Sequence, residues 1–219
     1  AAVLMSVDHC GIRARELDVF RRGISQVTGV PLEGVYIHAT HTHTGPFLFG
    51  DTEDPLEQEY YRFMLRRFND AAVLALEDCR PARMGWRVGE ADGIAFVRRY
   101  RMKDGTVRTN PGMGNPDIAA PIGEADKRVN VLRFDREKGS SIVAVNIGIH
   151  PDTIGGSRIS ADWPGFARRT VEKAVDHTRC LVFNGAQGDI NHVNPFAKGG
   201  DLNGMSLDFD GVYRGYGHA

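Results

Sequence analysis

Apolar residues recur three or four positions apart in three segments of the chain, the spacing that places them on one face of an α-helix. The first segment is followed by Gly29, a common helix stop, and the third is preceded by Asp162, a residue type that caps helix N-termini. The second opens on Asp54 and Pro55, and proline is favoured at a first helical position. We therefore predict helices over 13–27, 55–75 and 164–175.

Short apolar runs bounded by turn residues predict β-strands between these helices. The runs 141–149 and 180–184 are almost continuously apolar, as in strands that are covered on both faces. Segments 103–106 and 135–139 have the composition of hairpin turns. The Gly-, Pro- and Asn-rich segment 109–126 shows no periodicity and is predicted to be a long loop. The predicted strands are 3–7, 35–40, 84–88, 94–100, 129–134, 141–149 and 180–184.

Helices that alternate with buried strands predict an α/β protein, with helices layered on a mixed, largely parallel β-sheet. Four of the predicted strands end in polar or ionisable residues, which are Asp8, then His41 and His43, then His150, and then Asp189. Ligands of open α/β sheets bind beyond the carboxyl ends of the strands. If the four strands are parallel neighbours, these side chains meet in one crevice.

The composition fits one ordinary α/β domain. The chain has 219 residues, of which 42% are hydrophobic and 25% charged, which is enough for a substantial core. A net charge of -1 with dispersed Lys and Arg gives no support for a nucleic-acid partner or an anionic membrane. No apolar run approaches the roughly 20 residues that span a bilayer. Because the chain lacks an initiator Met and starts inside a predicted strand, we expect residues 1–219 to be a single catalytic domain of a longer chain.

The three cysteines do not indicate a disulfide framework or a zinc ribbon. They are odd in number and widely spaced, at Cys10, Cys79 and Cys180. We interpret them as buried small apolar residues.

The segment Ala39-Thr40-His41-Thr42-His43-Thr44-Gly45-Pro46 carries the strongest chemical signal. Histidines two positions apart on an extended chain point the same way, and two imidazoles on one side suit a cation such as zinc. The alternative is that both rings bind backbone groups or face water. His150 would add another zinc ligand if the fold brings it to His41, although a single histidine there is more often a structural residue. Asp189, in a glycine-flanked turn, would orient a ligand, act as a base, or only shape an Asx-turn.

These motifs resemble the neutral/alkaline non-lysosomal ceramidases. The likeness is based on segment 39–46, on the strand that ends at His150, on Ile159-Ser160-Ala161-Asp162, and on Asn184-Gly185-Ala186-Gln187-Gly188-Asp189. The order and separation of these motifs also agree, and the likeness covers nearly the whole chain. It implies a zinc amidohydrolase of sphingolipid metabolism that is secreted or periplasmic and acts on a small-molecule or lipid-like acyl substrate.

The resemblance also implies roles for individual residues. His41 and His150 would bind zinc, His43 would hydrogen-bond the reacting group, and Arg98 would help to position that group. On the sequence alone, Arg98 is equally well interpreted as a surface arginine of a strand. The remaining zinc ligands, a Glu and a Tyr, would come from farther along a longer chain.

One position departs from the ceramidase pattern. In that family the Gly-Asp pair is followed, after one apolar residue, by a serine that is central to catalysis. Here Gly188-Asp189-Ile190 is followed by Asn191. An amide cannot replace a hydroxyl as nucleophile, so a metal-activated water is the expected attacking group, and Asn191 would polarise or bind the substrate carbonyl. The departure argues against ceramide itself as the substrate.

We therefore expect a zinc-dependent hydrolase that cleaves an amide (N-acyl) bond with a metal-activated water. Two alternatives remain open. The same zinc site would act on an ester, a cyclic amide or a carbohydrate-linked substrate, or the chain would be a catalytically silent binding domain with the same fold. Substrate choice resides in loops such as 109–126, whose sequence does not separate these possibilities.

Overall fold

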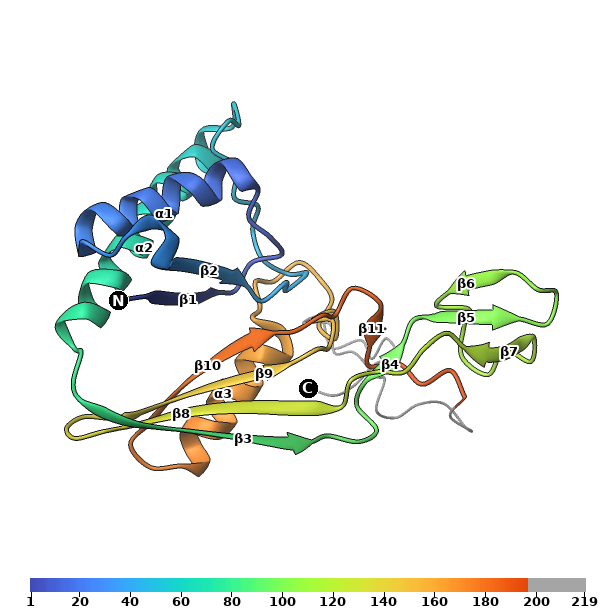
Figure 1. The fold of residues 1–219 in the computed structure, drawn as a ribbon. Helices are drawn as coiled ribbons and strands as arrows, with labels where there is room; N and C mark the ends of the chain where they lie inside the picture. The colour runs from blue at the N-terminus through green and yellow to red at the C-terminus, as the bar shows by residue number, and fades with distance from the viewer. Residues whose placement is uncertain (197–219) are drawn as a thin grey trace.

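The computed structural model describes residues 1–196, which form helices packed against several short β-sheets (Figure 1). The helices are α1 (Ala14–Thr28), α2 (Pro55–Glu77) and α3 (Asp162–Ala174), with a 3-10 helix, η1, at Leu32–Gly34. The strands are β1 (Val3–Val7), β2 (Val35–Ala39), β3 (Ala82–Glu90), β4 (Phe96–Val97), β5 (Arg99–Met102), β6 (Val107–Thr109), β7 (Ile118–Pro121), β8 (Arg128–Arg136), β9 (Ser141–Ile147), β10 (Thr178–Asn184) and β11 (Ile190–Asn191). The three predicted helices are thus confirmed.

The prediction of a mixed α/β protein is confirmed, but the prediction of a largely parallel sheet is wrong. Within residues 1–196, parallel pairing is limited to β1 with β2 and β9 with β10. Strand β8 pairs antiparallel with both β3 and β9, and the pairs β4–β11, β5–β6 and β5–β7 are also antiparallel. The physical reason is the turns at 103–106 and 135–139, because a short turn joins only antiparallel neighbours.

Helices α1 and α2 pack together over the β1–β2 pair (Figure 1). Asp54 caps α2 as predicted, since its carboxylate accepts the backbone N–H groups of the first helical turn. Gly29 ends α1 in the left-handed conformation, with φ of 70°, that glycine tolerates best. Phe20 and Ile24 are fully buried between the helices, and the ring centroids of Phe20 and Phe68 lie 4.6 Å apart.

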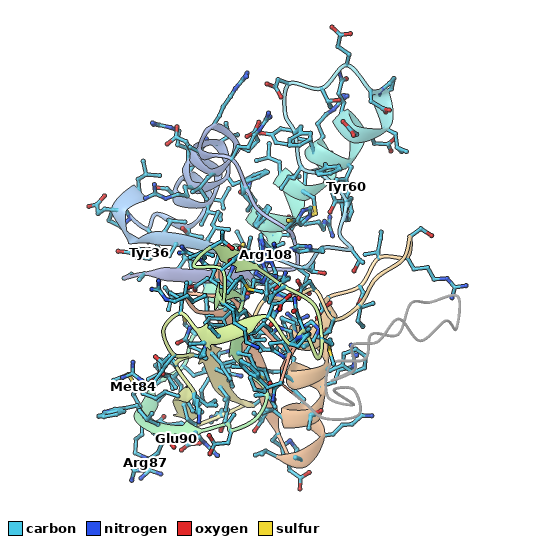
Figure 2. All side chains as sticks on the ribbon, turned by 90° about the vertical axis from the view of Figure 1, so that its right-hand side faces the viewer. Tyr36, Tyr60, Met84, Arg87, Glu90 and Arg108 are labelled. Atoms are coloured by element: carbon cyan, nitrogen blue, oxygen red, sulfur yellow. The ribbon has the colours of Figure 1, made fainter. Side chains whose placement is uncertain are left out.

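Helix α3 packs on the sheet of order β10-β9-β8-β3 (Figure 1). Apolar side chains from both layers form this core, which contains Val143, Cys180 and Val182 of the sheet and Trp163, Ala167 and Val171 of the helix. At the far edge of the sheet, every residue of β3 is exposed. Figure 2 shows Met84, Arg87 and Glu90 on this edge, away from the helices.

Side-chain hydrogen bonds join the β1–β2 pair to the carboxyl end of β10. Ser6 Oγ of β1 donates to the Val182 carbonyl at 2.7 Å, and Asn184 Nδ2 donates to the Thr40 carbonyl at 3.1 Å. The ends of β1, β2 and β10 therefore lie close together, as the sequence analysis expected. The carboxylate of Asp8 is used differently, because it pairs with Arg168 of α3 at 2.5 Å.

Three local predictions differ from the structure. The strand predicted over 94–100 is divided into β4 and β5, because the chain turns at Arg98. The loop predicted over 109–126 contains β7, which pairs with β5. Asp162 is the first residue of α3, and its N-cap is Ala161. In the described part of the chain, no helix combines the length and the apolar character needed to cross a bilayer.

Candidate metal centre

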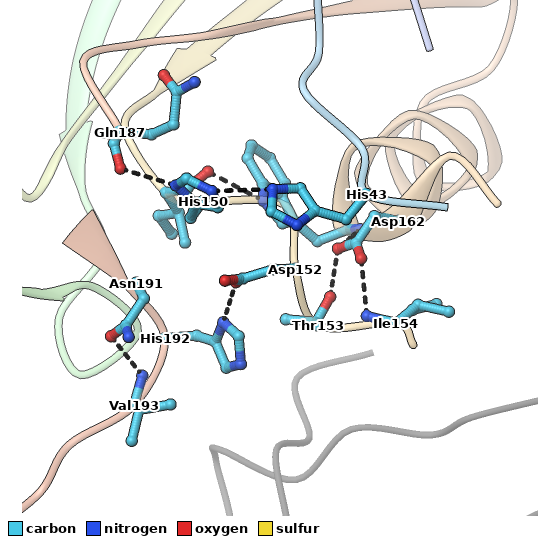
Figure 3. Close-up of polar contacts among 12 residues, drawn as sticks. His43, His150, Asp152, Thr153, Ile154, Asp162, Gln187, Asn191, His192 and Val193 are labelled. Carbon is cyan, nitrogen blue, oxygen red and sulfur yellow. Dashed lines mark hydrogen bonds and ion pairs between the residues drawn. The ribbon is translucent and has the colours of Figure 1, made fainter. Parts of the chain in front are cut away.

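The rings of His41, His43 and His150 meet edge to face just beyond the carboxyl ends of β2 and β9. Their centroids lie 4.7 to 5.0 Å apart in each pair. His43 Nε2 lies 3.4 Å from His41 Nε2 and 3.0 Å from His150 Nε2. Figure 3 shows the rings of His43 and His150 facing one another. The structure thus brings together histidines that are 107 positions apart in the sequence.

The chain that carries His41 and His43 is a turn, whereas the sequence analysis assumed an extended strand. His41 has φ of 72°, in the left-handed region that residues with side chains rarely adopt. Thr40 and Thr42 are fully buried on either side of it, and Thr42 Oγ1 donates to the Ser160 carbonyl at 2.7 Å. A strained left-handed residue of this kind costs about 1–3 kcal/mol and is found most often at functional sites.

Backbone carbonyls orient two of the three imidazoles. His41 Nδ1 donates to the Cys10 carbonyl at 2.5 Å, and His150 Nδ1 donates to the Gln187 carbonyl at 3.1 Å (Figure 3). Because a carbonyl only accepts, each Nδ1 carries the proton and each Nε2 keeps a lone pair. The Nε2 atoms of His41 and His150 both lie close to His43 Nε2. A proton on His43 Nε2 would form a good hydrogen bond with only one of them, whereas a cation could bind the lone pairs of all three nitrogens.

The donor set fits zinc. Zinc binds imidazole nitrogen at about 2.0–2.1 Å in a tetrahedral arrangement, which sets neighbouring nitrogens roughly 3.3 Å apart. The two Nε2 separations of 3.0 and 3.4 Å around His43 lie on either side of this value. Carbonyls that accept from Nδ1 are common outer partners of zinc-bound histidines. The prediction that the cysteines are buried holds for Cys180 but is wrong for Cys10 and Cys79, which are exposed. The thiol of Cys10 is therefore another available donor, since ligand atoms of Cys10, His41 and His43 lie within 4.8 Å of one another.

Burial lowers the pKa of His43 and thereby favours its neutral form, the form of imidazole that binds metal. It lowers the pKa of His150, which is 6% exposed, although the hydrogen bond to the Gln187 carbonyl acts in the opposite direction. Burial also lowers the pKa of His9, beside Tyr60, and of His38, beside the Asn184 carbonyl.

The free energy of unfolding of the metal-free protein is therefore expected to fall as the pH drops below about 6.5, the usual pKa of histidine. These imidazoles take up protons more readily in the unfolded chain than in the folded one. The unfolded state thus binds more protons in this window, and stability rises with pH. Urea unfolding at closely spaced pH values between about 5.5 and 7.5 measures the slope. Constant stability over this range would contradict the burial of neutral histidines.

Two polar residues that the sequence analysis missed, Asp152 and His192, lie near His150 (Figure 3). Arg98 Nη2 pairs with Asp152 Oδ2 at 2.6 Å, and His192 Nδ1 lies 3.4 Å from Asp152 Oδ1. Figure 3 shows Asp152 between His150 and His192. Burial alone would raise the pKa of Asp152, but the hydrogen bond from His192 and the nearby positive charges lower it overall. The carboxyl group is therefore ionised at neutral pH.

The other residues predicted for the site occupy different positions. Arg98 is partly buried and turned inward to Asp152, and its backbone N–H donates to the Asp189 carbonyl at 2.7 Å. Asp189 itself is exposed, and within residues 1–196 its carboxylate has no hydrogen bond or ion pair with the three histidines. Asn191 is buried and donates from Nδ2 to Asn110 Oδ1 at 3.1 Å.

A cavity of about 280 Å³ adjoins Asp152. Its volume is just below the range of about 300–1,000 Å³ that is typical of small-molecule sites. Burial raises the pKa of Tyr100, in its wall, to about 12, so this phenol stays neutral. The cavity combines apolar and polar walls, which include Val97, Tyr100, Asn110, Asp152, Asn191 and His192.

Two glycines let the ends of β9 and β10 approach closely below the histidines. A Cβ atom at Gly148 would lie 3.0 Å from the Ala186 carbonyl oxygen, and one at Gly185 would lie 3.2 Å from the Gly148 nitrogen. Both contacts are tighter than a side chain normally tolerates. They hold the chain before His150 against the segment that supplies the Gln187 carbonyl.

The substitution Gly148→Ala is expected to destabilise the fold by about 1–3 kcal/mol, because two backbones must separate to accept the methyl group. It is also expected to weaken zinc binding, since the separation moves His150 away from Gln187. Urea unfolding and zinc titration measure the two effects. Gly89→Ala is the matched control, because no atom lies within 4 Å of a Cβ at that position. Equal effects of the two substitutions would contradict this account of the close contact.

Two solved structures share the fold of this chain. The crystal structure of neutral ceramidase from Pseudomonas aeruginosa matches with a TM-score of 0.64 and 19% identity, over 90% of this chain and 32% of that chain. A structure of ceramidase complexed with C2 matches with a TM-score of 0.55 and 22% identity, over 82% of this chain and 28% of that chain. Identities this low establish a shared fold only. The present chain spans about a third of the length of these proteins.

Comparisons of sequence alone give no relative. No protein-family model and no curated protein matches the chain.

Proposed function

We propose that this chain carries the metal-binding part of a zinc-dependent hydrolase that cleaves an amide (N-acyl) bond. The observation that carries the proposal is the pair of Nε2 separations around His43, 3.4 Å to His41 and 3.0 Å to His150, which are close to the spacing of neighbouring ligands in a tetrahedral zinc site. The ceramidase fold supports the choice of bond, because ceramidases are named for the N-acyl lipid that they cleave. Fold alone does not fix a reaction, so the site carries the argument.

In this proposal His41 and His150 hold the zinc through Nε2, and their Nδ1 protons are fixed on the Cys10 and Gln187 carbonyls. His43 would provide a third nitrogen, and catalytic zinc sites with three protein ligands keep a position open for water or substrate. The ceramidase resemblance implies a different role for His43, a hydrogen bond to the reacting group. We favour ligation because the separations of its Nε2 from the other two fit shared coordination.

When bound, the metal supplies a water with a pKa near 7 and polarises the substrate carbonyl. Arg98, fixed by Asp152, provides positive charge beside the developing oxyanion. Asn191 binds the carbonyl through the Nδ2 hydrogen that does not face Asn110. Asp189 contributes through its backbone, by holding the Arg98 main chain in place.

The test is hydrolysis by the zinc-loaded protein of a series of N-acyl amines, esters and cyclic amides. We expect about one zinc per chain, turnover of N-acyl amines, and complete loss of turnover when 1,10-phenanthroline removes the metal. Restoration by added zinc is the control for damage by the chelator. Preferential turnover of esters or cyclic amides would assign a different bond, and bound zinc with no turnover at all would assign a silent binding domain.

A further inference from the structure

The cavity of about 280 Å³ is enclosed by two loops that are tied down by backbone hydrogen bonds. The N–H of Asn110 donates to the Arg98 carbonyl at 2.8 Å, and the N–H of Gly114 donates to the Pro195 carbonyl at 2.9 Å. The walls include residues 110–113 and 191–193, together with Tyr100. The three histidines of the metal centre do not line it, so the cavity is a separate space.

Tyr100 brings an unpaired hydroxyl to this cavity. The residue is 3% exposed and belongs to an apolar core with Met102 and Ile118. Among residues 1–196 its hydroxyl has no hydrogen-bond partner. The oxygen is nevertheless not sealed from solvent, so the small exposed part of Tyr100 that lines the cavity includes it. An unpaired hydroxyl at this depth costs free energy that a phenylalanine would avoid, which indicates that it serves a bound molecule.

A chain of hydrogen bonds orients two amide side chains in the wall of the same cavity. Val193 N–H donates to Asn191 Oδ1 at 3.0 Å (Figure 3), and Asn191 Nδ2 donates to Asn110 Oδ1 at 3.1 Å. Because a backbone N–H can only donate, the first bond identifies the oxygen of Asn191, and the second then identifies the oxygen of Asn110. The Nδ2 group of Asn110 remains, and in the described part of the chain it makes no hydrogen bond.

The Tyr100 hydroxyl and the Asn110 amide nitrogen can both donate to a ligand, and both are uncharged. Uncharged donors suit a neutral acceptor such as a carbonyl oxygen, because an anion would lose more hydration than such groups return. The guanidinium of Arg98 is already paired with Asp152, at 2.6 Å. The volume of the cavity requires the ligand, or the part of it that enters, to be small.

We propose that this cavity is a binding site for a small uncharged molecule or group that carries a carbonyl oxygen, which the Tyr100 hydroxyl and Asn110 Nδ2 hold. Apolar contacts from Val97, Pro111 and Met113 enclose the rest of the ligand. The site uses neither a metal nor the three histidines. It therefore goes beyond the hydrolysis proposed above, and binding alone tests it.

Three probes of similar shape distinguish the classes of ligand. N,N-diethylacetamide carries a carbonyl oxygen, triethylammonium is a cation without that oxygen, and 2-ethylbutanoate carries a carboxylate. In titrations of the full chain followed by two-dimensional NMR, we expect a Kd of about 1 mM for the amide, the same with and without zinc. Both ions should bind at least about tenfold more weakly, and the side-chain NH₂ signal of Asn110 should shift with the amide. Absence of amide binding, or an ion that binds as tightly, would overturn the proposal.

The substitution Tyr100→Phe removes a single oxygen atom. Because this hydroxyl has no partner to lose, the Tm is expected to stay unchanged, whereas the Kd of the amide rises about three- to tenfold. Tyr36→Phe, at an exposed tyrosine of β2 away from the cavity walls, is the matched control. An unchanged Kd in Tyr100→Phe, or a lower Tm, would show that the hydroxyl does not serve a ligand.

The substitution Asn110→Asp tests the second donor. It keeps an oxygen for Asn191 Nδ2 to bind but replaces the free NH₂ group with an acceptor. We expect the amide to bind about three- to tenfold more weakly and triethylammonium to bind more tightly than in the unmodified protein. Unchanged affinities for both probes would remove Asn110 from the site and contradict the proposal.

Discussion

The substitution His150→Ala is expected to abolish high-affinity zinc binding and to lower the rate of hydrolysis by more than about 100-fold. Loss of a residue that only hydrogen-bonds to a metal ligand costs up to about 100-fold, and loss of a ligand itself should cost more. His150 comes from a different part of the chain than the other two histidines, and its ring is buried and anchored to the Gln187 carbonyl. Among the described residues, the rings in contact with His43 are those of His41 and His150, so His43 and His41 alone would remain when His150 is removed.

Zinc titration with a fluorescent chelator as competitor measures the loss of affinity, and amide hydrolysis measures the loss of activity. His177→Asn serves as the control, because an exposed histidine outside the site is replaced. Zinc bound by His150→Ala as tightly as by the unmodified protein would remove His150 from the metal centre.

The substitution Asp162→Ala is expected to lower the free energy of unfolding by about 3 kcal/mol or more. The buried carboxylate accepts hydrogen bonds from the Thr153 hydroxyl and from the backbone N–H groups of Ile154 and Trp163. Without it these buried donors lose their acceptor, at about 1–3 kcal/mol each. Since Asp162 ties the start of α3 to the segment after His150, zinc affinity is expected to fall as well.

Urea unfolding and thermal melting at neutral pH measure this change, which corresponds to a fall in Tm of roughly 6 °C or more for a chain of this size. Asp176→Ala is the matched control, since this aspartate is exposed in the turn that follows α3. Similar stability of the two variants would show that the Asp162 hydrogen bonds contribute little to the fold.

Local sequence signals predicted the elements of the fold well. Helix α2 begins at the predicted Asp54–Pro55 pair because a cap and a first-turn proline act over only a few residues. The direction of strand pairing was predicted less well. The parallel arrangement was inferred from the alternation of helices and strands, although the hairpin turns in the same sequence already required antiparallel neighbours.

The candidate site was predicted only in part, for a similar reason. The two histidines of the 39–46 segment are visible as a motif, and His150 follows a strongly apolar strand. Asp152 and His192 have no motif, because they meet only where the segments after β9 and β10 cross. Asp152 lies two residues after His150, and His192 lies two residues after Ile190. These equal offsets indicate a contact only when the hydrogen bond between His150 and Ile190 is known, and the sequence does not show that bond.

Zinc K-edge X-ray absorption spectroscopy of the zinc-loaded protein tests most directly whether His41, His43 and His150 share one cation. We predict zinc–nitrogen distances of about 2.0–2.1 Å and an outer-shell signal that corresponds to three bound imidazoles. In His43→Gln the signal should correspond to two bound imidazoles. An imidazole signal that His43→Gln leaves unchanged, or a sulfur ligand at about 2.3 Å that Cys10→Ser removes, would contradict the three-histidine centre.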